Sequence, residues 1–166
     1  KQRYTKPLAI TPKNEANSFG QVWFRPVVVL TDASCYSACD LFSAGMQDAR
    51  AAVIIGIDDR TGAGGANVME YKTFRAIMGT DNNPFLPLPY GQNMRVSWRQ
   101  TLRSGINAGE ILEDSGVKSD QVIGLTKADI VKGESAELMA EIHRVVDKLS
   151  PKFTSGVPWA ASRSTS

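Results

Sequence analysis

Length, composition and charge limit what this chain can be. Its 166 residues fit one domain with a sizeable core, and 42% hydrophobic and 22% charged residues are ordinary for a globular chain. The net charge of +2, from 19 basic and 17 acidic residues, argues against nucleic acid or an anionic membrane as the main partner. No apolar run approaches the roughly 18 residues that a membrane-spanning helix needs.

We expect the folded part of the chain to run from residue 21 to residue 150. Residues 1–20 are polar and irregular, with Pro7, Pro12 and Gly20, which is typical of a lead-in segment. Residues 151–166 begin with a proline that stops a helix, and we expect a flexible tail. The chain starts without methionine and without an apolar signal core, so we expect a piece of a longer protein.

The first strong pattern is a strand, helix, strand unit at residues 27–57. Residues 27–30 are a continuous apolar run, typical of a parallel strand that is covered on both faces. One helical stripe follows, formed by Ala38, Leu41, Phe42, Gly45, Met46 and Ala49. Residues 51–57 form a second apolar run, so the unit predicts a crossover between two parallel strands.

The later elements are weaker until the last helix. After a glycine-rich loop at residues 58–68, the three prolines of residues 81–91 indicate an extended loop, and alternation over residues 93–99 predicts a half-buried strand. Thr126, with Asp129 three residues on, predicts a capped one-turn helix. Residues 135–149 form the clearest amphipathic helix. The fold class is therefore α/β.

Cys35 and Cys39 are four residues apart. If both lie on the first turn of the helix, a bridge between them would be strained. No further cysteine and no nearby histidine completes a zinc-binding set. We therefore expect two small buried thiols and no metal site, which leaves the redox compartment open.

Ser37 lies where the first strand gives way to the helix, a position suited to nucleophilic chemistry. The first N–H groups of a helix have no internal partners and carry partial positive charge, so they can hold an oxyanion. Ala38 N–H is the first candidate donor. The alternative is an ordinary helix N-cap, a role that serine fills well. The G-x-S-x-G motif of α/β-hydrolases is absent.

The S41 peptidases, which include the tail-specific, C-terminal-processing proteases and their tricorn-core relatives, are the family that this chain resembles. The likeness lies first in VVVLTDASCYSACDLFSAGMQDARAAVIIG. Residues 37–40 match the family's Ser-Ala-x-Glu/Asp motif, residues 47–48 its Gln-Asp pair, and residues 61–65 its Thr-x-Gly loop. GEILEDSGVKSD is similar to its Ile-Glu-x-x-Gly-Val-x-Pro-Asp segment, with Ser119 where proline is usual.

The resemblance implies a Ser-His-Glu triad and not a Ser-Lys dyad. The loop that carries the dyad lysine in bacterial relatives reads TGAGG here, and Lys72 lies well past it. In the tricorn-like branch the glutamate of the Ile-Glu segment orients the histidine, which implies this role for Glu113. From the residues alone, Glu113 would be a surface carboxylate. The one histidine, His143, flanks the apolar face of the last helix, where we expect a structural or half-exposed side chain.

The resemblance also implies what lies outside this chain. The family's catalytic histidine precedes the serine, so we expect residues 21–150 to be the C-terminal part of a protease domain. Its fold would be part of a crotonase/ClpP-like superhelix of ββα units. A polypeptide substrate is expected, together with an N-terminal portion of the same protein that carries the histidine, and no cofactor. Alone, this chain would hydrolyse little. The resemblance suggests an extracytoplasmic location and leaves homo-oligomerisation open.

Two other functions are compatible with the sequence. One is a non-catalytic peptide-binding or scaffold domain that keeps the peptidase fold, and the other is a crotonase-type acyl-CoA enzyme, whose adenine and pantetheine contacts we do not find. The TGAGGA segment fits neither the dinucleotide fingerprint nor the P-loop. We interpret it as a substrate-side turn that needs positive φ.

Overall fold

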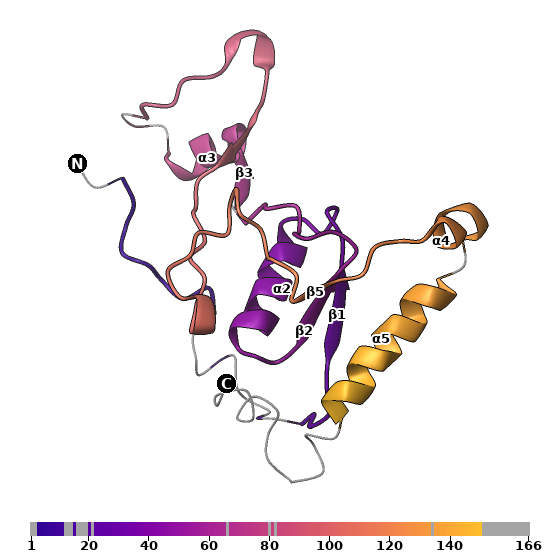
Figure 1. The fold of residues 1–166 in the computed structure, drawn as a ribbon. Helices are drawn as coiled ribbons and strands as arrows, with labels where there is room; N and C mark the ends of the chain where they lie inside the picture. Colours follow the sequence, from indigo (N-terminus) through magenta and orange to yellow (C-terminus); the bar gives the residue numbers. More distant parts are fainter. Residues whose placement is uncertain are drawn as a thin grey trace.

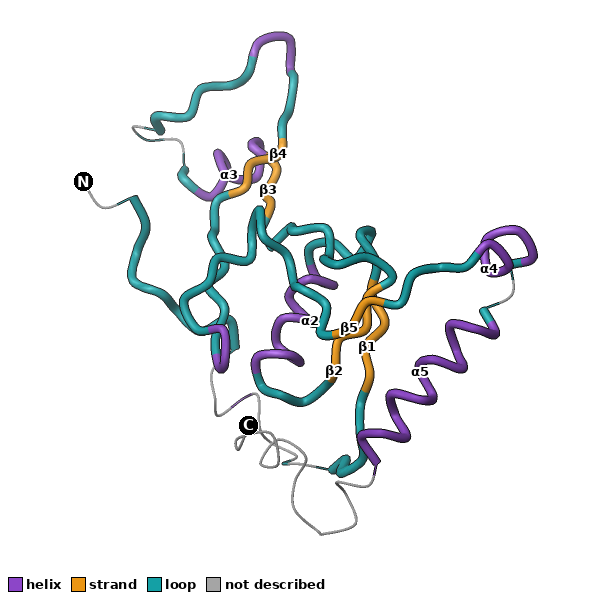
Figure 2. The backbone as a smooth tube through the Cα atoms, viewed as in Figure 1, coloured by secondary structure: helices purple, strands orange, loops and turns teal. Residues whose placement is uncertain are grey.

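The computed structural model describes residues 3–11, 15, 20, 22–65, 67–79, 81, 83–133 and 135–150, so the predicted tail at residues 151–166 lies outside the described residues. Figures 1 and 2 show the arrangement of the elements. In chain order they are β1 (Val28–Thr31), α2 (Ala38–Asp48), β2 (Val53–Gly56), β3 (Val68–Glu70), α3 (Tyr71–Ile77), η1 (Pro89–Gly91), β4 (Arg95–Ser97), η2 (Gly105–Asn107), β5 (Gln121–Val122), α4 (Lys127–Lys132) and α5 (Ala136–Leu149).

A parallel three-stranded sheet forms the centre of the molecule, with the strand order β1-β2-β5. β1 and β2 pair over all four residues of each strand, and β2 pairs with β5 through Ile55 and Gly56. Because α2 connects β1 to β2, the predicted crossover between parallel strands is confirmed. The loops that follow β1 and β2 leave the same edge of the sheet, where α/β proteins usually carry their sites.

Helices cover both faces of this sheet. One core lies on the α2 side and is formed by Ala44, Ile54, Leu112 and Val117. The other lies on the α5 side and is formed by Val53, Ile55 and Val145. Successive side chains of β2 therefore enter opposite cores, as the two-residue period of a strand requires.

The face that α2 buries differs from the predicted apolar stripe. The helix forms as predicted, but Phe42 is 57% exposed. The buried residues of the helix are Asp40, Ser43, Ala44, Gln47 and Asp48. Polar loops cover this face, and an ion pair of 2.6 Å joins buried Asp48 to buried Arg103. Polar side chains can be buried here because they have hydrogen-bond partners. A prediction from the spacing of apolar residues cannot detect a buried face of this kind.

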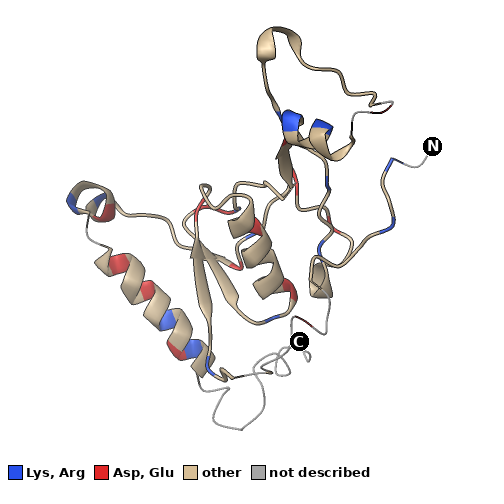
Figure 3. Cartoon of the chain, turned by 180° about the vertical axis from the view of Figure 1, so that it is seen from behind, with Lys and Arg blue, Asp and Glu red and all other residues tan. Residues whose placement is uncertain are grey.

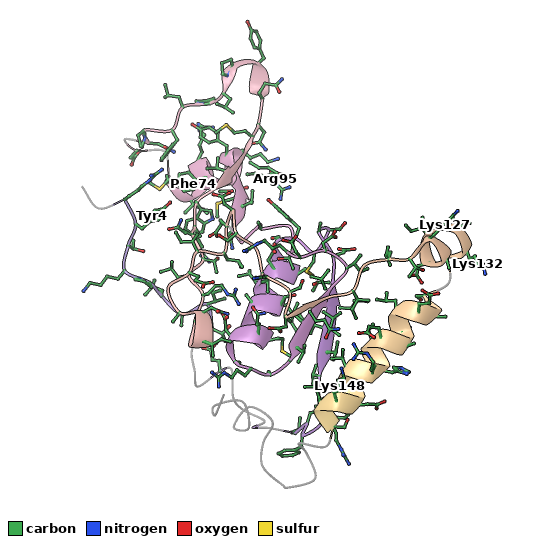
Figure 4. All side chains as sticks on the ribbon, viewed as in Figure 1. Tyr4, Phe74, Arg95, Lys127, Lys132 and Lys148 are labelled. Carbon is green, nitrogen blue, oxygen red and sulfur yellow. A yellow bond between two sulfur atoms is a disulfide. The ribbon has the colours of Figure 1, made fainter. Side chains whose placement is uncertain are left out.

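The segment from β3 to β4 projects from the core as an arm (Figure 1). β3 and β4 pair in antiparallel fashion, and the predicted strand exists as β4, with Val96 half-buried and its neighbours exposed. Figure 4 labels Phe74 of α3 and Arg95 of β4 in this arm. The ring of Phe74 meets that of Phe85 edge-on, with 4.9 Å between the centroids, so the arm has a small aromatic core of its own.

The two C-terminal helices agree with the predictions. Thr126 caps α4: its N–H donates to the Asp129 carboxylate (2.7 Å), and its hydroxyl accepts from the Asp129 N–H (3.3 Å). α5 follows its N-cap residue Ser135 and buries Leu138 and Val145. Figure 3 shows basic and acidic residues interspersed along α5. Within the described residues, no helix has both the length and the apolarity to cross a membrane.

Candidate active site

Ser37 is held in an unusual backbone conformation between β1 and α2. Its φ of 60° and ψ of −108° lie in a region that residues other than glycine rarely adopt. Ser37 and Asp40 form a capping box. In one half of it, Ser37 N–H donates to the Asp40 carboxylate (2.7 Å). In the other half, the Ser37 side chain faces the Asp40 N–H without meeting the geometry of a hydrogen bond, and Ser37 is exposed. Ser37 thus occupies the N-cap position while its hydroxyl stays accessible.

Ala38 is the first residue of α2 and lies at the positive end of the helix. Among the described residues, no acceptor pairs with its N–H group. This N–H is therefore available to a ligand next to the Ser37 hydroxyl. The N–H group predicted to hold an oxyanion thus lies beside the predicted nucleophile.

The expectation of two free thiols is wrong, because Cys35 and Cys39 form a disulfide. α2 begins at Ala38, so Cys35 lies in the preceding turn and not on the first helical turn. The two Cα atoms are 5.1 Å apart, within the range that a disulfide spans. Only Cys35 is buried. The bridge closes a short ring with Ser37 at its centre.

Asp40 is a site residue to which the sequence analysis gave no role. Its side chain is completely buried. Its carboxylate accepts four hydrogen bonds of 2.5 to 3.2 Å, from Ser37 N–H, the Thr61 hydroxyl, Ala63 N–H and Gly64 N–H. Its place in the Ser-Ala-x-Glu/Asp motif was the one signal in the sequence that pointed to it.

The glycine-rich loop at residues 61–65 packs against the Ser37 turn. Gly62 N–H donates to the Cys35 carbonyl (2.8 Å). A Cβ atom on Gly62 or Gly64 would lie 2.6 or 2.3 Å from the Tyr36 side chain, which is closer than real contacts allow. The loop contains the expected positive φ, which falls on Ala63 (65°) and not on one of the glycines. At Gly62 a Cβ would also lie 2.8 Å from the Ala33 carbonyl oxygen, so this glycine is needed for the close approach of the two segments.

Glu113 lies at the other end of the same loop. It is half-buried, and both of its carboxylate oxygens accept from Thr101 N–H (2.8 and 3.0 Å). The Thr101 hydroxyl donates to the Gly65 carbonyl (2.7 Å), and a Cβ on Gly65 would approach Glu113 Oε1 to 3.1 Å. Glu113 is therefore an anchored carboxylate and not a free surface group. Loop 61–65 joins it to the Ser37 turn, with no direct hydrogen bond between the two side chains.

The other candidate bases lie elsewhere. His143, expected to be structural or half-exposed, is exposed on α5, which covers the sheet face opposite α2. Lys72 belongs to the projecting arm and pairs with Glu70 (3.1 Å), where it holds the pKa of that carboxyl below its ordinary value. The described part of the chain has no group of three or more His, Cys, Asp or Glu side chains that could hold a metal.

A protein-family model and solved structures are similar to this chain. The model of peptidase family S41 matches residues 1–87 of the 166, a range that includes Ser37 and the glycine-rich loop but not Glu113. No curated protein matches the chain.

Two solved structures share the fold. "Structure of mature CPAF complexed with lactacystin" is similar with a TM-score of 0.59 and 19% identity, over 80% of this chain and 22% of that one. "Crystal Structure of mature CPAF" has a TM-score of 0.59 and 17% identity, over 90% of this chain and 23% of that one. The chain thus spans less than a quarter of either neighbour. At these identities the likeness concerns the mixed α/β fold with its parallel sheet. Because the family model covers more than half of the sequence, the chain belongs to peptidase family S41.

Proposed function

We propose that the protein is a serine endopeptidase whose nucleophile is Ser37. The observation that carries this proposal is a strained, exposed serine on a strand-to-helix turn in a chain of a peptidase family. Backbone strain is retained where function uses it, and other serine hydrolases present Oγ on a turn of this kind. An ordinary cap would not need the strained backbone.

The proposed reaction is acyl transfer. Ser37 Oγ attacks the scissile carbonyl carbon while a base takes its proton, and Ala38 N–H stabilises the resulting oxyanion. The protonated base then gives its proton to the leaving amine as the C–N bond breaks. Water, deprotonated by the same base, releases the acyl group from Ser37. A polypeptide is the substrate.

Glu113 is proposed to orient the histidine that serves as this base. Its carboxylate is already fixed by Thr101 and would hold the imidazole in one tautomer and stabilise the imidazolium. His143 is excluded by its place on α5. The histidine would come from an N-terminal portion of the same protein, as in the tricorn-like branch. The complete domain would then form a crotonase/ClpP-like superhelix of ββα units, which a structure of the full-length protein would check.

We place this activity in an oxidising compartment outside the cytoplasm. The supporting observation is the Cys35–Cys39 bridge, because disulfides persist mainly in such environments. Native protein treated with a maleimide should stay unlabelled at both cysteines until a reductant is added. Labelling of either cysteine without reductant would contradict this assignment.

Covalent labelling of the full-length protein with a fluorophosphonate tests the nucleophile. We expect one adduct, mapped to Ser37, that disappears in Ser37→Ala together with the peptidase activity. Activity that persists in Ser37→Ala would rule out the mechanism.

Glu113→Gln tests the triad, with Asp114→Asn as the matched control. The first change removes the charge that stabilises the imidazolium, so kcat should fall at least about 100-fold. The second makes the same chemical change on the exposed neighbour and should leave kcat within about twofold. Unchanged turnover in Glu113→Gln would remove this residue from the site.

A non-catalytic peptide-binding domain is the second candidate function. It is favoured by one observation, that the only histidine of the chain lies on α5, across the sheet from α2. Full-length protein that binds peptides but neither hydrolyses them nor reacts with a fluorophosphonate would support it.

A further inference from the structure

The Asp40 carboxylate joins two segments that are separate in the sequence. One of its hydrogen bonds comes from Ser37 N–H, three residues before it (2.7 Å). The other three come from the glycine-rich loop: the Thr61 hydroxyl (2.5 Å), Ala63 N–H (3.2 Å) and Gly64 N–H (2.8 Å). A carboxylate removed from water costs several kcal/mol unless its oxygens are paired. Here each oxygen has two donors, so complete burial is tolerated.

A capping role alone does not account for this arrangement. Asp129 makes the same capping hydrogen bond at the start of α4. Its side chain is half-buried, and these bonds join it only to Thr126, within the same capping box. Asp40 differs in that three of its four donors belong to residues 21 to 24 positions away. The bond to Ser37 N–H restrains the peptide group that defines the φ of Ser37. The bonds to the loop hold that loop against Tyr36, next to Ser37.

We propose that Asp40 is a positioning residue, which locks the glycine-rich loop to the Ser37 turn and so keeps Ser37 at positive φ with its hydroxyl exposed. This inference rests on the proposed function, in which Ser37 is the nucleophile. Asp40 does not act as the base, because its two oxygens already accept four hydrogen bonds and retain no acceptor site for the serine proton. It acts on the reaction only through the backbone of Ser37.

The chemistry of the side chain makes this testable without a change of size. In Asp40→Asn an amide NH₂ replaces one oxygen. Turned toward Ser37 and Gly64, it faces two N–H donors, and turned toward Thr61 and Ala63, it faces the Ala63 N–H and a hydroxyl that can rotate to accept. In either orientation at least one of the four donors loses its acceptor. The turn and the loop should separate slightly. Small misplacements of a reacting group cost up to about 100-fold in rate. Asp129→Asn is the matched control, since it makes the same change in a capping box that lies away from α2 (Figure 1).

The first measurement is hydrogen–deuterium exchange of the full-length protein, which does not depend on activity. Asp40→Asn should speed exchange in residues 36–41 and 61–65 together, whereas Asp129→Asn should speed it only near residue 126. Protection at both segments equal to the wild type would overturn the proposal. So would increased exchange spread evenly over the chain in Asp129→Asn as well as in Asp40→Asn.

The second measurement is the rate of fluorophosphonate labelling, with kcat and KM for a peptide. Asp40→Asn should lower labelling and kcat by about 10- to 100-fold, with KM changed by less than about threefold and the pH profile unmoved, because the base is intact. Should Asp40→Asn fail to fold, Thr61→Val removes one of the four donors together with the acceptor of Val117 N–H (2.8 Å), and Thr61→Ser, which keeps both bonds, should restore the rate. A folded Asp40→Asn or Thr61→Val that labels at the wild-type rate would refute positioning. Wild-type protein that does not label would instead refute the proposed function, and the exchange data would still decide whether Asp40 locks the loop.

Discussion

Replacing Ser37 by glycine and by alanine would measure the strain at the proposed nucleophile. At a φ of 60° and ψ of −108°, a side chain costs about 1–3 kcal/mol, which glycine escapes because it has no Cβ. Neither variant has the hydroxyl, so the comparison is independent of activity. Glycine and alanine also differ in their preference for the N-cap position and in the conformational entropy that they give the unfolded chain. A control position is needed at which these two differences are present without the positive φ.

Ser135 supplies that control. It is also an exposed N-cap serine without a cap hydrogen bond, at the start of α5, but its φ is −100°. The difference between glycine and alanine at this position contains the cap and unfolded-chain effects and no relief of positive φ. We therefore expect the stability advantage of glycine over alanine to be greater at position 37 than at position 135 by about 1–3 kcal/mol.

Urea unfolding of the four variants, followed by far-UV circular dichroism, gives this difference directly. Thermal melts should agree, at about 2–4 °C per kcal/mol for a domain of 150–250 residues. If the two glycine–alanine differences match within about 0.5 kcal/mol, the limit of additivity for distant sites, the turn stores no strain. The inference from backbone conformation to nucleophile would then fail.

Two further predictions concern the supports of the site. Cys35→Ser combined with Cys39→Ser should lower the free energy of unfolding by about 2 kcal/mol, the loop-closure value for a four-residue separation, and an unchanged urea midpoint would contradict it. Arg103→Met leaves the Asp48 carboxylate buried without its ion-pair partner, so it should cost about 3–5 kcal/mol in the same assay. Adding Asp48→Leu should recover part of that loss, and a double variant less stable than Arg103→Met would show that the pair does not act as described.

The parts of the fold that could be predicted are those with local causes. The crossover between β1 and β2 follows from two apolar runs separated by one helix length. The Thr126 capping box and the amphipathic face of α5 are also complete within a few residues of sequence. Each of these elements forms where its pattern indicates, because the pattern that specifies it is contained in a short stretch of sequence.

The parts that were missed depend on distant partners. The buried face of α2 is polar, and its Asp48 pairs with Arg103, which lies 55 residues further along the chain. The periodicity of apolar residues cannot predict such a pair. The disulfide depends on the residue at which α2 begins, and Cys35 proves to lie outside the helix. The short strand β3 is stable only against β4, on the far side of a long loop.

The residues of the candidate site could be named from the sequence, but their geometry could not. Ser37 and Ala38 were singled out by their place between strand and helix and by the resemblance to the family, and Glu113 by the resemblance alone. The structure places the Ser37 turn and Glu113 against the same loop, and the roles of these residues remain predictions. The positive φ of Ser37 and the buried carboxylate of Asp40 arise from that assembly of turn and loop. The spacing of residues along the chain indicates neither feature.

The strand order has a practical consequence for handling the protein. β1 has β2 as its single neighbour within the described residues, and Leu30 on it is 42% exposed. An uncovered strand edge is a template for pairing with other molecules. A polypeptide of these 166 residues purified by itself should therefore self-associate and precipitate through β1. Keeping the remainder of the full-length protein in place, or adding a lysine on this edge, should yield a monodisperse sample.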